Sequence, residues 1–272
     1  MKTLSTILSI ILLSITVNAQ KLPTEQQASL RAPANIKVDG KAIEWDNKFQ
    51  AFNKHVDFFY NMANDDNKLY LTIQVTEPSV IRRICSAGIT LLINKSGKKN
   101  EKEGMAITYP VFENNNRFTP MLKYTSSAPG SIVNIRNAGI ESNSPKQAPL
   151  TDSAINVTNK NMTAKAKLIR TSGFKNIDTL ISVYNIDGIK ATALFDNKMV
   201  YTLELSIDLK QLDLSVNNAD KFTYELRVNE VEQHGINITK DPAGNITMIN
   251  VTAGGEMSQA QTDFWADYTL AK

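Results

Sequence analysis

The chain of 272 residues contains one cysteine, Cys85, and two histidines, His55 and His234. A single cysteine forms no internal disulfide, so the fold must be stabilised by a packed core, and about 250 residues are enough to build one. This scarcity leaves few ways to assemble a zinc or thiol site. A haem site needs axial Met or His ligands, and no spacing of the histidines and methionines selects a pair. We interpret Cys85 as a small buried hydrophobe, with a reactive thiol beside Arg82 and Arg83 as the alternative.

Several catalytic signatures are also missing. The sequence has no Gly-x-Ser-x-Gly elbow, no His-Glu-x-x-His pair and no phosphate-binding Walker loop. Glycoside hydrolysis needs only two carboxylates at a set separation, so the 27 acidic residues leave a glycosidase open as an alternative. The 30 basic residues nearly balance the acidic ones, and the lysine cluster of residues 95–102 is mixed with Glu101 and Glu103. We therefore expect no nucleic-acid partner, because such proteins concentrate basic residues on one face.

Only one long apolar run occurs, and it lies at the N-terminus. Leu4–Val17 follows Lys2 and precedes Asn18-Ala19, a pattern typical of a secretory signal peptide cleaved before Gln20. The alternative is a membrane anchor, but the run is shorter than the roughly 20 apolar residues that a spanning helix needs. We therefore predict a signal peptide over residues 1–19, a secreted or periplasmic protein, and no transmembrane segment after cleavage. Residues 20–34 are polar and predict a loose leader.

The remainder is dominated by short segments of alternating polarity separated by turn residues, which favours an antiparallel β-sandwich. The predicted strands are Ile36–Val38, Val56–Met62, Leu69–Val75, Ile89–Ile93, Met105–Val111, Ala164–Ile169, Leu180–Val183, Lys190–Phe195, Met199–Ile207 and Phe222–Val228. The clearest is Met199–Ile207, in which Tyr201, Leu203, Leu205 and Ile207 share one face and Val200, Thr202, Glu204 and Ser206 share the other.

We expect the all-β fold to be a single jelly-roll-like domain over residues 35–272. Residues 113–164 predict a long irregular insertion, because they hold loop-forming clusters and few long apolar runs. The Asp187-Gly188 pair predicts a β-hairpin turn, and Asp208–Leu212 predicts a helical turn. No segment predicts a long amphipathic helix.

A set of turns and strands also occurs in a characteristic order. It comprises Val38-Asp39-Gly40, Glu44-Trp45, Asn64-Asp65-Asp66 before Leu69-Tyr70-Leu71, the strand Gly88–Asn94 and the late strand Val200–Leu209. Over roughly residues 34–112 and 178–228 this set resembles the family 9 carbohydrate-binding module and its DOMON-like relatives. The tail Asp263–Ala271 looks like the ending of exported members. The resemblance implies a non-catalytic exported module that binds a saccharide, with Asp39, Gly40, Trp45, Tyr70 and Trp265 in structural roles.

The resemblance implies that aromatic rings, usually tryptophans, hold the sugar. Here Trp45 matches the structural tryptophan, which we expect to plug one end of the sandwich, and we expect Trp265 in the tail to pack against it. The candidate rings for ligand stacking are therefore Phe58, Tyr60, Tyr109, Phe112 and Tyr124.

We expect no cofactor apart from a possible structural calcium. Asp39, Asp65 and Asp66 have the oxygen ligands that Ca²⁺ prefers, although Asn64-Asp65-Asp66 equally suits a plain Asx-type turn. Besides saccharide binding, two alternatives remain open from the sequence. One is a structural or protein-interaction module of the cell envelope, and the other is a glycoside hydrolase or esterase.

Overall fold

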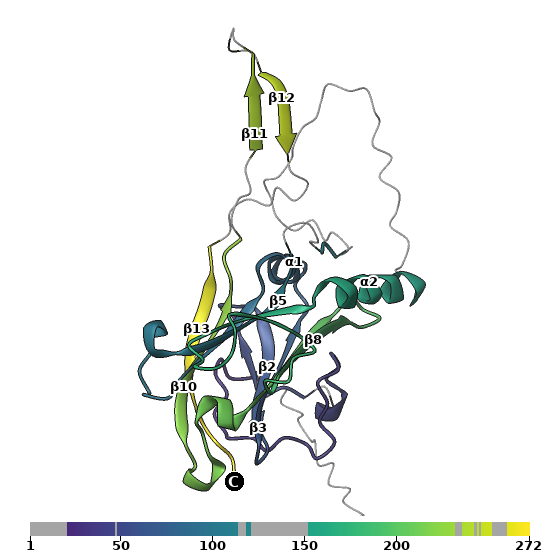
Figure 1. Ribbon diagram of the computed structural model, residues 1–272. Helices are drawn as coiled ribbons and strands as arrows, with labels where there is room; N and C mark the ends of the chain where they lie inside the picture. The colour runs from purple at the N-terminus through teal and green to yellow at the C-terminus, as the bar shows by residue number, and fades with distance from the viewer. Residues whose placement is uncertain are drawn as a thin grey trace, which may run out of the picture.

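The computed structural model describes residues 21–46, 48–113, 118–120, 152–231, 236–241, 244, 246–251 and 260–272. The described chain consists mainly of β-strands, and two antiparallel sheets form the body of the molecule (Figure 1). The five-stranded sheet has, in order, β1 (Ala51–Asn53), β2 (Phe58–Asn64), β3 (Lys68–Val75), β9 (Tyr201–Asp208) and β8 (Ile189–Phe195). The six-stranded sheet has β13 (Thr262–Thr269), β10 (Lys221–Val228), β4 (Ile89–Asn94), β5 (Met105–Val111), β6 (Leu168–Ser172) and β7 (Leu180–Ser182). A separate hairpin of β11 (Ile236–Lys240) and β12 (Ile246–Val251) lies apart from both sheets in Figure 1. The predicted all-β sandwich is confirmed.

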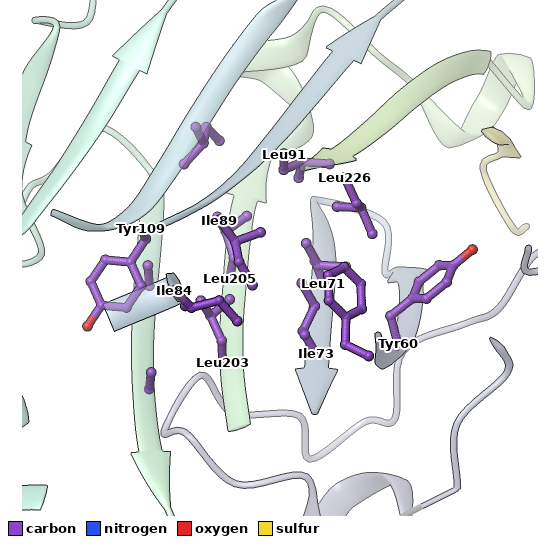
Figure 2. Packing of buried hydrophobic residues seen from close by; sticks show 14 of the residues in the cluster. Tyr60, Leu71, Ile73, Ile84, Ile89, Leu91, Tyr109, Leu203, Leu205 and Leu226 are labelled. Atoms are coloured by element: carbon purple, nitrogen blue, oxygen red, sulfur yellow. The ribbon is translucent and has the colours of Figure 1, made fainter. Parts of the chain in front are cut away.

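The core lies between the two sheets and is built by alternation along each strand. In β9, Leu203 and Leu205 point into the core while Thr202 and Glu204 lie on the outward face, as predicted. Figure 2 shows these leucines packed near residues of α1, β3 and β4 in one continuous apolar layer. Since successive side chains point to opposite faces, each sheet also has an outward face. The alternation does not determine whether that face is covered by another segment or exposed to solvent.

Two helices occur where the sequence predicted none. Helix α1 (Pro78–Ala87) begins at Glu77, whose side chain accepts a hydrogen bond from the Ser79 N–H, and ends at Gly88 with φ of 79°. Its side chains Val80, Ile81, Ile84 and Cys85 are buried in the core. The helix connects β3 of one sheet with β4 of the other, and Ile84 lies near Tyr109 and Leu203 (Figure 2). The predicted burial of Cys85 is confirmed, whereas this helix of ten residues was not predicted.

Helix α2 (Asp152–Lys165) occupies part of the predicted irregular insertion. It buries Ile155, Thr158 and Met162, and the Asn159 amide bonds both to the N–H and to the carbonyl of Phe195 at 2.8 Å each. These bonds satisfy the backbone of β8, the edge strand of its sheet. The prediction of an irregular segment over residues 113–164 is therefore wrong for residues 152–164, and the strand predicted from Ala164 begins only at Leu168.

The predicted leader is part of the fold. The Gln26 side chain pairs with the backbone of Met62 through two hydrogen bonds of 2.8 Å, and the Leu30 N–H donates to the Tyr268 hydroxyl at 3.2 Å. Residues 21–34 thus connect β2 of one sheet with β13 of the other. The expectation of a loose leader is wrong, because its polar side chains hydrogen-bond to backbone groups at a strand edge instead of pointing into solvent. The predicted signal peptide, residues 1–19, lies outside the described residues.

Two local predictions are wrong, the strand at residues 36–38 and the hairpin at Asp187-Gly188. Residues 36–38 form no strand. The turn at Asp187-Gly188 does not close a hairpin, because β7 pairs with β6 in one sheet and β8 pairs with β9 in the other. The predicted helical turn after β9 is confirmed as a short 3₁₀-helix, η3 (Leu209–Leu212). Among the helices of the described segments, none is long and apolar enough to cross a membrane.

Candidate functional site

The outward face of the five-stranded sheet is covered by the segment of residues 36–50, which we call the N-terminal cover. Trp45 lies in its short helix η1 (Ile43–Trp45), is 8% exposed, and donates from Nε1 to the Thr72 hydroxyl at 3.0 Å. Phe49 of the cover packs on Phe59 of β2 with ring centroids 5.9 Å apart. Trp45 is therefore buried as a structural residue, but against a sheet face rather than at one end of the sandwich.

Glu204 lies beneath this cover and is 2% exposed. Its Oε2 accepts hydrogen bonds from the N–H groups of Asp39 and Gly40, both at 2.9 Å. Gly40 has φ of 83°, and a Cβ there would lie 2.8 Å from Cγ of Leu194. The predicted Asp39-Gly40 turn thus brings two backbone N–H donors close to the buried carboxylate of Glu204. Glycine suits this position because it adopts a positive φ and has no Cβ.

Among the residues that the structure describes, no cation forms an ion pair with Glu204. Its Oε1 and the buried Oε2 of Glu44 lack hydrogen-bond partners among the described residues. Burial raises the pKa of Glu204 to about 7; the two backbone donors oppose this rise, and the charges of Asp39 and Glu44 add to it. A group so deeply covered cannot touch a ligand from solvent, so we assign Glu204 a structural role.

The outward face of the six-stranded sheet, which we call the open face, is accessible along its outer strands but buried at its centre, where Glu225, Leu92, Thr90 and Thr108 are 1–9% exposed. Cross-strand register arranges its outward residues in two rows. One row runs Asp263, Arg227, Thr90, Thr108, Arg170 and Leu180; the other runs Trp265, Glu225, Leu92, Ala106 and Ser172. The connection between β4 and β5 covers part of it, since a Cβ on Gly104 would lie 2.5 Å from Leu92. The positions on β6, β7 and β13 stay exposed or half-buried.

A buried ion pair lies at the centre of this face. Arg227 donates from Nε and Nη2 to the two carboxylate oxygens of Glu225, each at 2.8 Å, and Nη2 also lies 3.1 Å from Oε1 of Glu101. Burial raises the pKa of Glu225 despite Arg227, and the two carboxylates raise the pKa of Arg227 despite its own burial. The bidentate geometry holds the two buried groups in one fixed plane.

Trp265 is directly opposite Glu225 in the register between β13 and β10 and is half-buried. Trp265 points to the outward face of the sheet, because it lies between the core residues Phe264 and Ala266 in an alternating strand. Close to Arg227, the Thr90 and Thr108 hydroxyls lie 2.7 Å apart, and Thr90 donates to Asn229 at 2.9 Å. The open face thus combines a partly exposed ring with a buried ion pair and two buried threonine hydroxyls.

The rings predicted to stack on a ligand lie elsewhere. Phe58, Tyr60 and Tyr109 are buried in the core, and the Tyr60 hydroxyl lies 3.1 Å from that of Tyr224 on the opposite sheet. The expectation that these three contact a ligand is corrected by their inward positions. Phe112 is half-buried and stacks on Phe118 at 6.2 Å.

Tyr124 lies outside the described residues. Strand alternation flagged about half of the aromatic residues as core, but it did not say which sheet face would stay open.

The three predicted metal ligands, Asp39, Asp65 and Asp66, each bond to different protein groups. The Asp65 carboxylate accepts from the N–H groups of Asn67 and Lys68 and from the Tyr70 hydroxyl, all at 2.7 Å. Burial and this carboxylate raise the pKa of Tyr70. Asp66 pairs with Arg31 at 2.8 Å, and Asp39 accepts from the Lys41 N–H at 3.1 Å.

Nowhere in the described ranges do three or more His, Cys, Asp or Glu side chains gather to hold a metal ion. The geometry around Asp65 is that of an Asx-type turn that also supports the buried Tyr70.

Fold and site together define only a class, a β-sandwich of two antiparallel sheets with one outward face covered and the other partly open. Comparison with family models, curated proteins and solved structures gives no match for this chain.

Proposed function

We propose that this protein is an exported, non-catalytic module that binds carbohydrate on its open face, in the manner implied by the resemblance to family 9 modules. The observation that carries the proposal is the half-buried Trp265 beside the Glu225–Arg227 pair. A sugar presents an apolar C–H face, which packs on an aromatic ring, and hydroxyl groups, which hydrogen-bond to accessible polar side chains. A few polar groups held rigidly beside an apolar surface are typical of small-ligand sites.

The arrangement of carboxylates supports binding rather than hydrolysis. Glu204 and Glu225 are the two central buried acids, and they lie on opposite outward faces of the sandwich. Packed sheets are about 10 Å apart, so their outward side chains are separated by more than the roughly 5–9.5 Å at which glycosidase carboxylates flank a bond. Glu44 is close enough to raise the pKa of Glu204, but Glu44 is part of the N-terminal cover and Glu204 lies buried beneath that cover. A glycosidase is therefore the least favoured function.

Binding to a broad glycan array, followed by calorimetry on the best ligands, tests the proposal. We expect Trp265→Ala to abolish binding and Tyr184→Ala, which removes an exposed ring elsewhere, to preserve it. Silence of the unmodified protein across the array, or equal loss in both variants, would contradict the proposal. Cell fractionation with N-terminal sequencing tests export, and the expected mature N-terminus is Gln20.

A second function, protein interaction in the cell envelope, is favoured by one loop. Between β7 and β8, Tyr184 is 72% exposed and Ile186 is 99% exposed. The Asn185 amide donates to the carbonyls of Ser182 and Ile189 at 2.7 and 2.8 Å, which holds the loop in one conformation. Rigid exposed aromatic and aliphatic side chains suit protein interfaces.

A photo-crosslinker at position 186, used in the exporting cell, tests this alternative. A recurrent cross-linked protein that is lost in Tyr184→Ser but kept in Trp265→Ala supports it. A cross-linking pattern unchanged by Tyr184→Ser rejects it.

A further inference from the structure

The edge strands of the two main sheets differ in how their outer sides are covered. At β1 the Phe52 N–H donates to the carbonyl of Pro23 in the leader at 2.9 Å, and at β8 the Asn159 amide of α2 bonds to the backbone. Strand β7 is only three residues long. Strand β13 has eight residues. In the part of the chain that the structure describes, no hydrogen bond from another segment reaches the outer backbone side of β13 between Asp263 and Asp267.

One hydrogen bond fixes the direction in which the backbone groups of β13 point. The Leu270 N–H donates at 3.0 Å to the carbonyl of Asp220, which is the residue directly opposite when the register of β10 and β13 is extended. Hydrogen-bonded and non-hydrogen-bonded pairs alternate along an antiparallel ladder, so every second residue counted back from Leu270 bonds to β10. The intervening residues Asp263, Trp265 and Asp267 therefore direct their N–H and C=O groups to the free edge.

Thr269 belongs to the same outward-directed set and marks the end of the free edge. The Ser29 hydroxyl of the leader donates to the Thr269 carbonyl at 2.6 Å. The stretch from Asp263 to Asp267 remains, and at about 3.4 Å per residue it is about 14 Å long. This length accommodates one extended segment of about five residues, which would add to the sheet as a further strand and bond to the free backbone groups.

The side chains beside this edge carry mainly negative charge. Asp263, Trp265 and Asp267 share the outward face of β13 and are exposed or half-buried. Asp263 has no ion pair with a described residue, whereas Asp267 pairs with Lys221 at 3.0 Å. The carboxylates around Trp265 outnumber the cations: they are Asp263, Asp267, Glu225 and Glu101, against Arg227 and Lys221. A segment that pairs with this edge is therefore favoured when it is basic.

The same charges argue against a second copy of this chain as the added strand. Two antiparallel copies of β13 centred on Trp265 would place Asp263 of each copy opposite Asp267 of the other. Like charges directly opposite each other destabilise a strand pair. A strand with basic residues at two alternate positions and an apolar residue between them instead sets opposite charges beside both aspartates and an apolar side chain beside Trp265.

We propose that the free edge of β13 accepts an extended basic segment of a partner protein as an additional strand, with basic, apolar and basic residues at alternate positions. The backbone groups of Asp263, Trp265 and Asp267 supply the pairing. The two aspartates select the charge of the segment, and Trp265 packs against its central residue. This inference goes beyond the proposed carbohydrate function and does not depend on it.

The test uses synthetic peptides that differ in charge or in one backbone donor. The probe is Thr-Lys-Thr-Val-Thr-Lys-Thr, and its acidic counterpart carries Glu in place of both Lys. Two further peptides keep the lysines but carry one N-methyl group, on the central Val or on the Thr after it. Calorimetry at low and moderate salt measures binding, and NMR measures amide hydrogen exchange in the protein with and without the probe.

We expect the basic peptide to bind at least about tenfold more tightly than the acidic one, from two exposed charge pairs. Alternate residues of a strand direct their N–H groups to opposite edges, so only one of the two methylated peptides should lose binding. Exchange of the Asp263, Trp265 and Asp267 amides should slow at least about tenfold when the probe binds. The Phe264 and Ala266 amides, which already bond to β10, are the internal control.

Three protein variants test the edge itself. Asp263→Lys should weaken binding of the basic peptide about tenfold. Asp178→Lys is the matched control, because it reverses an exposed charge on the connection between β6 and β7 at the other side of the sheet and should change nothing. Asp267→Pro removes a donor from the free edge without removing a bond to β10 and should abolish binding. Circular dichroism checks that the variants fold.

Four results would overturn the inference. Equal binding of both methylated peptides, or equal weakening by Asp263→Lys and Asp178→Lys, would show charge attraction without strand addition. No binding of the basic peptide would show that the aspartates only protect the edge. Sedimentation of the protein as a dimer that Asp267→Pro dissociates would assign the edge to a second copy. None of these results bears on the glycan array, which tests the carbohydrate function separately.

Discussion

The two outward faces of the sandwich each bury a central glutamate, and the two are stabilised in different ways. Glu204 on β9 is 2% exposed and accepts two backbone N–H groups from the N-terminal cover. Glu225 on β10 is 1% exposed and pairs with Arg227 of its own strand. Backbone donors have to come from another segment, which then covers the face, whereas Arg227 satisfies Glu225 from the same strand, and the outward positions of β6, β7 and β13 stay exposed or half-buried. The manner in which a buried acid is satisfied thus separates the structural face from the candidate binding face.

The largest expected difference between the faces concerns their tryptophans. Trp45→Ala should lower the free energy of unfolding by about 4 kcal/mol, because it removes a buried ring and leaves a cavity under the cover. Trp265→Ala should cost about 1 kcal/mol or less, since its ring is only half-buried. Urea denaturation at pH 7 measures both. Equal losses would contradict the distinction between a covered and an open face.

Removing the arginine should uncover the cost of a buried charge. Arg227→Met leaves Glu225 without its partner and should destabilise the protein by about 3 kcal/mol. Adding Glu225→Gln to this variant should recover much of the loss, because no charge then remains buried. Denaturation of the single and double variants measures the coupling. A double variant no more stable than Arg227→Met would show that packing, not charge, explains the loss.

Replacement by glutamine should change the free energy of unfolding in opposite directions at Glu204 and Glu225. The pKa of Glu204 is raised to about 7 from its ordinary 4.5, so its contribution to stability is fully present below pH 4.5 and is lost as the pH rises through 7. The difference corresponds to about 3 kcal/mol. Glu204→Gln should therefore stabilise the protein at pH 8 by roughly 2 kcal/mol and flatten its stability between pH 5 and 8.

Glu225→Gln is the matched control for that experiment. It takes a charge from Arg227 and should destabilise the protein at pH 8. The test is the free energy of unfolding of the unmodified protein, Glu204→Gln and Glu225→Gln at pH 5, 6, 7 and 8. Destabilisation by both substitutions at pH 8 would refute the proposed difference between the two glutamates.

The smallest expected effect concerns attachment of the N-terminal cover. Gly40→Ala forces a side chain into a left-handed conformation and against Leu194, and should cost about 2 kcal/mol. Gly97 also has a positive φ, of 72°, but a Cβ added there would meet nothing within 4 Å. Gly97→Ala should therefore cost about 1 kcal/mol. Thermal unfolding compares the two. A Gly97→Ala loss as large as that of Gly40→Ala would show that backbone strain alone is responsible.

Much of the secondary structure was predictable because it follows from nearest neighbours along the chain. The strand Met105–Val111 is found at the predicted bounds, and the inward and outward faces of β9 are confirmed. Helix α1 was missed although Pro78 at its first turn, the cap at Glu77 and Gly88 after its end are recognisable signals. Helix α2 carries weaker signals, and its position depends on hydrogen bonds between Asn159 and a strand 36 residues away.

The candidate site was harder to predict than the strands. Phe58, Tyr60 and Tyr109 were named from ring type, yet alternation directs them into the core. Trp265 was assigned to packing, yet it lies on the open face, where only pairing with β10 places it opposite Glu225. Ring type indicates what a residue is able to bind, but exposure is decided by strands that are distant in sequence.

By itself, the sequence determined an all-β protein whose strands alternate apolar and polar side chains, because this periodicity depends only on residues adjacent in the chain. Only the tertiary structure decided which outward face is covered, because contacts such as that between Asp39 and Glu204 join residues 165 positions apart. It also sent β7 and β8 into different sheets across a turn that locally resembles a hairpin. Long-range pairing sets these features, since burial of a face requires a second segment that no local pattern identifies.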